Sequence, residues 1–411
     1  MKFKKLLFIF PFLFINFVFA QTGFVNNGMT INVESGAYVN VVNFTNNQTD
    51  SIDGSINLDG ILIVNGDLEN NSSGNVFANI EPVPDGNVVL NGTDQNISGT
   101  TSINFENLTV NNSTKTLNLD NCIVKGILSI NGVIDLNKNR LVIDSSDPGA
   151  IAFTSGCIKS ESVPADGLGE IQWNIGSSTG TYTVPFGTGS GNNDHNLVLK
   201  INSVPSPATG SIVFATYPTD GANKPYPAGV VSLDTFLPEN LSDRYWKIEP
   251  NYTTKPAVSV SFKYNADDVD QNDNPKLVED NLMAVRYNDI SNQWVDMKMK
   301  GVDNVLTQTV NVDNISENDF FTYWTLSEFQ LRIPNAFTPD NDGKNDVFMK
   351  GYALKIVNRW GEVLYEGQDG WDGTRDGKKV SAGTYYYVVS IPDVDKSLKS
   401  LTGVITVVVS E

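Results

Sequence analysis

The segment Ser55–Leu58 reads SINL, and after one further residue Gly60–Val64 reads GILIV. Runs of the same kind recur, each with a few apolar residues and most followed closely by Asn, Asp or Gly. In a parallel β-solenoid each coil adds a small inward-facing apolar pair to a continuous core, and polar residues turn the chain. We therefore predict a β-solenoid-like region over residues 21–160. The further runs are Asn87–Leu90, Leu108–Val110, Leu117–Leu119, Ile127–Ile130, Val133–Leu136 and Leu141–Ile143.

The spacing of these runs drifts, which leaves an irregular β-sandwich as the competing fold for the same region. The many asparagines between the runs also allow two interpretations. They could stack as ladders at the corners of a solenoid, or they could mark solvent-exposed turns. Because Asn is a common turn residue, the sequence favours turns.

Residues 161–330 carry longer strands and more aromatic residues. Val258–Phe262 reads VSVSF and Tyr245–Ile248 reads YWKI, an alternation typical of half-buried strands. We predict an antiparallel β-sandwich here, joined to the first region near Ser160–Gly169, where Pro and Gly cluster. Sustained helical periodicity is not found, so the whole chain is predicted to be all-β.

The charge balance and the cysteine count narrow the function further. The chain has 411 residues with 28 basic and 47 acidic side chains, a formal net charge of −19. Such an acidic protein is not expected to bind nucleic acid. Cys122 and Cys157 are too few for a disulfide scaffold, and the sequence does not decide whether they pair.

Residues 1–20 have the layout of a signal peptide. Three lysines among the first five residues precede an apolar run, Leu6–Ala20, which ends in a small residue at the expected cut. The run is shorter than the roughly 20 residues of a membrane-spanning helix. Gln21 follows the cut in place of a Cys, so a lipid anchor is not indicated. We expect an exported protein that does not span the membrane.

The last part of the chain contains four sequence blocks. Ile333–Phe348 reads IPNAFTPDNDGKNDVF, Lys355–Glu366 reads KIVNRWGEVLYE, Trp371–Val389 reads WDGTRDGKKVSAGTYYYVV, and Gly403–Val409 reads GVITVVV. Gly361 can supply the positive φ of a hairpin turn. About six short strands are expected, which fits a small Ig-like β-sandwich.

Together these blocks resemble the gliding-motility-associated C-terminal domain of Bacteroidetes, the type B sorting domain of the type IX secretion system, here at residues 331–411. The resemblance implies export across the outer membrane and retention at the cell surface. It also implies two partners, the type IX secretion machinery and an outer-membrane attachment protein. The motif residues are Asn358, Arg359, Trp360, Gly361, Trp371, Asp372, Gly373, Gly383, Thr384 and Tyr385.

One segment of the sorting domain suggests calcium, the single cofactor for which the sequence gives any indication. Asp340, Asp342 and Asp346 alternate around a glycine as in the first half of a calcium-binding loop. Lys344 stands where such a loop usually offers an oxygen. A turn in which Asp and Asn side chains cap backbone amides is the favoured alternative.

The sequence gives no positive sign of catalysis. His195 is the single histidine, and a site with several His ligands is therefore excluded. We predict a surface protein that is not an enzyme and whose N-terminal regions are adhesive or structural. The alternative is a secreted polysaccharide-active enzyme or a carbohydrate-binding protein on the same sorting signal. Surface polysaccharide is the further partner that the sequence suggests.

Overall fold

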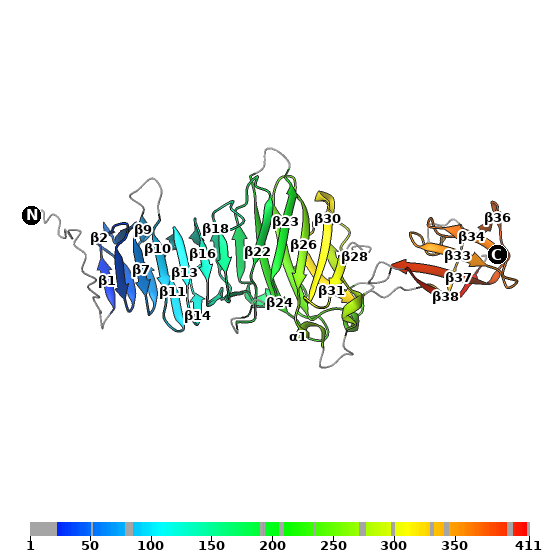
Figure 1. The fold of residues 1–411 in the computed structure, drawn as a ribbon, viewed down its shortest axis with the longest axis horizontal. Helices are drawn as coiled ribbons and strands as arrows, with labels where there is room; N and C mark the ends of the chain where they lie inside the picture. The colour runs from blue at the N-terminus through cyan, green and yellow to red at the C-terminus, as the bar shows by residue number, and fades with distance from the viewer. Residues whose placement is uncertain are drawn as a thin grey trace, which may run out of the picture. The chain divides into compact units, whose positions relative to one another are not determined.

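The computed structural model describes residues 23–408 except 51, 79–84, 190–191, 193, 205–208, 234–235, 271–276, 297–300, 329–332, 341–344 and 393–397. The predicted signal peptide, residues 1–20, lies outside this part. Two compact units are present, Met1–Ser327 and Glu328–Glu411. Nearly all regular structure is β-strand, which confirms the predicted all-β class (Figure 1). In the described residues no helix has the length and apolarity needed to cross a membrane.

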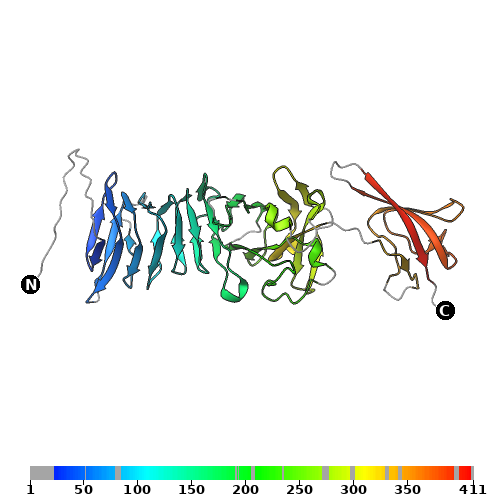
Figure 2. The same ribbon diagram turned by 90° about the horizontal axis from the view of Figure 1, so that it is seen from below.

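The N-terminal region is a parallel β-solenoid in which each coil contributes one strand to each of three faces (Figures 1 and 2). The first face contains β1 (Phe24–Asn27), β4 (Phe44–Thr49), β8 (Leu68–Asn71), β11 (Gln95–Gly99), β14 (Thr114–Leu117), β17 (Val133–Asp135) and β20 (Cys157–Lys159). The short β5 (Ile52–Asp53) lies outside this stack and pairs antiparallel with the end of β4. The second face contains β3 (Tyr38–Val41), β7 (Ile61–Val64), β10 (Asn87–Leu90), β13 (Asn107–Val110), β16 (Leu128–Ile130) and β19 (Ile151–Phe153). The third face contains β2 (Thr30–Val33), β6 (Ser55–Leu58), β9 (Phe77–Ala78), β12 (Asn104–Phe105), β15 (Cys122–Val124) and β18 (Arg140–Ile143).

Strand register explains why such short apolar runs suffice for this fold. Leu62 of β7 is in register with Val88 of β10, which is in register with Leu108 of β13, and all three side chains are buried. On each of these strands the buried residues alternate with residues that face outward. Each coil thus adds a pair of buried side chains to one growing core, which confirms the solenoid and excludes the competing sandwich for this region.

The asparagines form ladders, so the interpretation that favoured plain turns was wrong. Inside the solenoid the Asn26 amide donates to Asn46 Oδ1 at 3.0 Å, and the Asn46 amide donates to Asn70 Oδ1 at 3.0 Å. On the surface, amides of successive coils are linked in the same way, as in Asn47 to Asn27 at 2.9 Å. Parallel strands in register place identical side chains one strand spacing apart, so each amide can both donate and accept.

The sheet changes from parallel to antiparallel at β21 (Glu170–Trp173). This strand pairs in parallel with β18 and antiparallel with β24 (Ser211–Pro218). The predicted antiparallel region follows as two packed sheets, with the orders β21-β24-β25-β31-β27-β28 and β22-β23-β26-β30-β29. Its other strands are β22 (Gly180–Val184), β23 (Leu197–Ser203), β25 (Arg244–Asn251), β26 (Ala257–Lys263), β27 (Leu282–Asn288), β28 (Gln293–Asp296), β29 (Gly301–Asn304), β30 (Thr309–Ile315) and β31 (Tyr323–Glu328). The helices are η1 (Pro164–Asp166), η2 (Pro238–Asn240), α1 (Ala266–Val269), η3 (Glu279–Asn281) and η4 (Glu317–Asp319).

One large apolar core extends through both regions of the first unit, from Val33 in the solenoid to Leu326 in the last sandwich strand, and a smaller separate cluster around Tyr245 and Trp294 lies in the sandwich. The predicted link, Ser160–Gly169, is the connection between β20 and β21, with η1 inside it. Cys122 and Cys157 are both buried and are not joined by a disulfide, and burial raises the pKa of Cys122 to about 11.

The C-terminal unit contains a five-stranded sheet and a two-stranded hairpin. The sheet has the order β32 (Ala336–Phe337), β38 (Leu398–Val407), β37 (Gly383–Pro392), β33 (Ala353–Val357) and β34 (Val363–Gly367). The hairpin consists of β35 (Thr374–Arg375) and β36 (Lys378–Lys379). A separate core, with Phe337, Phe348 and Trp371 at its centre, covers one face of the sheet.

Candidate functional site

The WDGT block, one of the motifs singled out in the sequence, forms a corner around a buried tryptophan. Trp371 is fully buried, lies 5.4 Å from the Phe337 ring, and donates its indole N–H to the carbonyl of Thr374 at 2.8 Å. Asp372 caps the turn by accepting from the backbone N–H and the hydroxyl of Thr374. Gly373 has φ +72°, and a Cβ there would lie 2.7 Å from Pro339 Cγ. These residues build the core of the domain.

The NRWG block forms the turn between β33 and β34. Asn358 Oδ1 accepts from the backbone N–H groups of Trp360 and Glu362, and Gly361 adopts the predicted positive φ, +82°. The Arg375 guanidinium, 2.6 Å from Glu362, lowers the pKa of that carboxyl. Asn358, Gly361 and Glu362 thus fix the turn. The side chains of Arg359 and Trp360 lie on its outside and are exposed.

Trp360 is 82% exposed, in contrast to the buried Trp371. Its ring has the Arg359 guanidinium 5.4 Å from the centroid. An indole held outside the core by a fixed turn contributes little to folding, so it is available for contact with another molecule.

The GTYYY block begins β37 and alternates between the two faces of the sheet. Gly383 has φ +149°, and Thr384 is exposed. Tyr385 packs on the core at 5.2 Å from Trp371, and its hydroxyl donates to the Ser381 carbonyl. The next residue on the strand therefore points away from the core.

Tyr386, the outward-facing residue after Tyr385, belongs to an apolar row that sequence reasoning missed. Tyr386 is in register with Val357 on one side and Val404 on the other, and Val357 is in register with Val363. Tyr386, Val404 and Val363 are all exposed. We call Val363, Val357, Tyr386 and Val404, together with Trp360, the apolar row. The alternation within β37 is its sequence signal, but the register that aligns four strands cannot be read from one strand.

The suggested calcium loop is described only in part. Asp342 lies outside the described residues, whereas Asp340 is exposed and donates its backbone N–H to the Thr338 carbonyl at 2.9 Å. Within the described part of the chain, no group of three or more His, Cys, Asp or Glu side chains could hold a metal ion. Calcium binding at Asp340, Asp342 and Asp346 stays a prediction.

His195 lies at the centre of a buried charge network in the first unit. Its Nε2 is 2.9 Å from Asp268, which in turn accepts from Arg244 Nε at 2.8 Å. Burial opposes the charged forms of Asp268 and His195, yet Arg244 and His195 lower the pKa of Asp268 to about 2. Burial likewise opposes protonated His195, but Asp194 and Asp268 raise its pKa. Sequence reasoning did not find this network, because His195 and Asp268 are 73 residues apart and their pairing is not visible along the chain.

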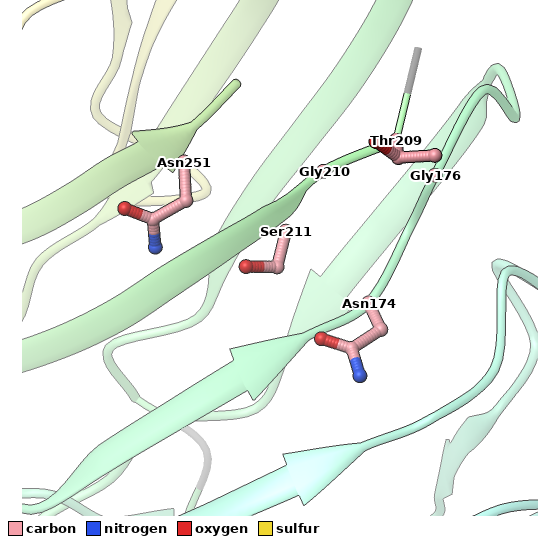
Figure 3. A pocket seen from close by; sticks show the side chains of 6 residues that line it. All are labelled: Asn174, Gly176, Thr209, Gly210, Ser211 and Asn251. Atoms are coloured by element: carbon pink, nitrogen blue, oxygen red, sulfur yellow. The ribbon is translucent and has the colours of Figure 1, made fainter. Parts of the chain in front are cut away.

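A shallow hollow of about 430 Å³ lies at the ends of three sandwich strands (Figure 3). Asn174, Ser211 and Asn251 extend into it from β21, β24 and β25 or their immediate ends. Asn174 is fixed by donating to Asp144 Oδ1 at 2.8 Å and accepting from Gln172. The described lining residues offer amides and hydroxyls but no acid or base, so none of them can serve as a group for proton transfer.

Comparison with known proteins gives a family match for the C-terminal part of the chain. No curated protein matches the chain. Residues 331–407 match the model of the CHU_C type IX secretion signal domain, as the four sequence blocks predicted. The matched segment contains the WDGT corner, the NRWG turn and the apolar row. The chain is therefore an exported protein that carries a CHU_C type IX secretion signal domain at residues 331–407.

Proposed function

We propose that the protein is displayed on the outer-membrane surface, where the solenoid and sandwich act as an adhesive or structural body. The sorting domain is the part that contacts the secretion machinery and an outer-membrane attachment protein. The observation that carries the proposal is the division of the chain: the secretion signal coincides with a separately packed unit, Glu328–Glu411. A unit with its own core can be handled by the export apparatus without unfolding the body.

The construction of the first unit supports a display role. One large apolar core runs through most of its interior, and ladders of paired amides run along its surface from coil to coil. A scaffold of this kind offers a long, regular and rigid surface, which is the property that adhesion to an extended target requires.

The buried position of His195 supports a non-enzymatic body. A general base has to come within hydrogen-bond reach of a substrate. The His195 side chain has no exposed surface, and carboxylates face both ring nitrogens, at 3.0 Å for Asp194 and 2.9 Å for Asp268. The network joins β25, α1 and the loop before β23, so its evident function is to stabilise the sandwich.

The test is surface accessibility in a bacterium that has the type IX system. The full chain is compared with a chain truncated after Leu331, and both are treated with added protease on intact cells and detected by blot. We expect the full chain alone to be degraded from outside. The truncated chain should stay in the periplasm, protected until the outer membrane is opened. Equal exposure of both chains would contradict sorting by the C-terminal unit.

A further inference from the structure

A groove follows the outer face of the second solenoid sheet and crosses β3, β7, β10, β13 and β16. Its volume is about 490 Å³. The register aligns outward side chains along it: Tyr38 pairs with Ile61, Ile61 with Asn87, and Asn87 with Asn107. Because Tyr38 is its largest exposed side chain, we call this hollow the Tyr38 groove.

The floor of the Tyr38 groove mixes apolar surface with hydrogen-bonding groups. Tyr38 is 70% exposed and Ile127 is also exposed, at the two ends of the row. Between them, the Asn87 amide donates to the Thr109 hydroxyl at 3.1 Å, which leaves the second amide hydrogen and a carbonyl lone pair of Asn87 for a ligand. An exposed aromatic ring beside ordered amides and hydroxyls fits a ligand that has both apolar faces and hydroxyl edges.

Asp59 gives an independent sign of a missing ligand. Asp59 lines the Tyr38 groove and is only 5% exposed. Its Oδ1 atom has no hydrogen-bond partner in the described structure. A buried carboxylate oxygen without a partner is unfavourable, because it has lost its hydrogen bonds to water and gained none in the protein. A donor arriving in the groove, such as a hydroxyl, would satisfy it.

The charge and the backbone of the groove exclude other classes of ligand. Among the residues that the structure describes, Asp59 and Asp85 line the groove and no Lys or Arg does, so polyanions are repelled. β7, β10 and β13 are hydrogen-bonded to neighbours on both sides, so under the middle of the groove a peptide finds no free strand edge to extend. The groove therefore suits a ligand without negative charge that is recognised by side chains and not by strand pairing.

We propose that the Tyr38 groove binds an uncharged polysaccharide that runs across the strands. One sugar ring lies on the Tyr38 ring, and sugar hydroxyls donate to Asp59 and bond with the Asn87–Thr109 pair. Successive strands repeat their side chains every 4.7–4.9 Å or so, a spacing comparable to the advance of one sugar along an extended polysaccharide. This ligand assignment rests on the proposed adhesive function and names its target class.

The test is affinity electrophoresis of the purified chain starting at Gln21, in gels that contain a soluble β-glucan, a mannan, a xylan or a polyuronate. We expect at least one of the three neutral polysaccharides to retard the protein, and the polyuronate to leave it unretarded. Tyr38→Ala should weaken binding about tenfold or more, and Asp59→Asn several-fold. Tyr386→Ala, which removes an exposed tyrosine from the other unit, is the matched control and should bind like the unchanged protein.

The proposal is overturned if none of the neutral polysaccharides retards the protein, if the polyuronate alone does, or if Tyr38→Ala binds normally. Because Tyr38 is mostly exposed, its replacement should not disturb folding, which an unchanged circular dichroism spectrum would verify. The measurement uses purified protein in solution. A failure here therefore leaves the export result untouched, and a failure of export leaves this binding result valid.

Discussion

At the scale of single residues, the two tryptophans of the sorting domain have opposite surroundings. Trp371 is fully buried between Phe337 and Tyr385, whereas Trp360 is 82% exposed. Trp371→Ala should lower the free energy of unfolding of the C-terminal unit by about 3–5 kcal/mol, since it leaves a large cavity. Trp360→Ala should change it by less than about 0.5 kcal/mol.

Pulse proteolysis over a urea series, with a blot for the C-terminal end, measures this difference on the whole mature chain. The two variants serve as each other's control because the same side chain is removed. Equal stability of the two variants would mean that Trp371 does not hold the core of the unit together.

Asp243 gives a pH-dependent prediction. Burial, Asp268 and Asp220 raise its pKa to about 7, well above the 3.8 of an ordinary Asp. The folded protein thus keeps this proton over a range in which the unfolded chain has lost it, so Asp243 makes stability fall as pH rises from about 4 to 7. Asp243→Asn cannot ionise, and it should be more stable than the unchanged protein at pH 8.

The gain at pH 8 is expected to be about 1 kcal/mol, because solvent screens this half-buried carboxyl. Near pH 4 the two proteins should differ little, since Asp243 is protonated there when folded. Thermal unfolding midpoints at the two pH values provide the measurement. A difference that is the same at both would show that the effect is not electrostatic.

At the scale of elements, the buried asparagine ladder stabilises the stacking of the first coils. Asn46→Ala removes the acceptor of the Asn26 amide and the donor to Asn70 Oδ1, leaving both groups buried without that partner. We expect a loss of about 2–3 kcal/mol in unfolding free energy. Asn47→Ala, in the surface ladder one residue along β4, should lose only a few tenths because water replaces the amide.

Urea unfolding of the mature chain measures both variants under the same conditions. A large loss for Asn47→Ala, or none for Asn46→Ala, would contradict the assignment of the inner ladder as the stabilising one.

The solenoid was predictable from its short apolar runs, but its ladders were not. An apolar pair followed by a turn residue reports local burial, and that signal is contained in each run. Asn26, Asn46 and Asn70 are separated by 20 and 24 residues, so no fixed period in the sequence aligns them. Their stacking depends on a register that only the assembled coils define. The pairing of His195 with Asp268, 73 residues apart, was hidden for the same reason.

The apolar row of the sorting domain leads to a prediction about export. It presents an aromatic and aliphatic surface across four strands of a unit whose opposite face is already packed. Contact with the secretion machinery is its expected use, because exposed apolar rows mark interaction sites. Trp360→Ala combined with Tyr386→Ala should reduce surface exposure several-fold in the protease assay, although the unit stays folded.

Lys355→Ala combined with Thr384→Ala is the control for this experiment, since both lie in the same sheet but outside the row. Normal export of the double aromatic variant would show that the machinery reads another surface. Loss of export in both double variants would point to a general disturbance of the sheet.

At the scale of the whole chain, strands of the sandwich region pair with the last coil of the solenoid and cover its end. The sequence predicted a link between two regions near residue 160, because Pro164, Gly167 and Gly169 cluster there. In the structure these residues turn the chain between β20 and β21. The next strands pair directly with the last coil. β21 continues the sheet beyond β18, and the segment after β22 bonds to the outer edge of β20, where Ile158 donates to the Pro185 carbonyl at 2.8 Å.

This arrangement predicts what happens when the sandwich is removed. A solenoid cut after Ser160 would present the bare edges of β18 and β20 and the apolar side chains of its last coil, which are now covered by Ile171, Trp173 and their neighbours. Open parallel edges of this kind recruit other chains. We expect a fragment of residues 21–160 to aggregate, and a fragment of residues 21–327 to elute as a monomer in size-exclusion chromatography with light scattering. A soluble, monomeric short fragment would mean that the coils close their own end and that the sandwich is an independent attachment.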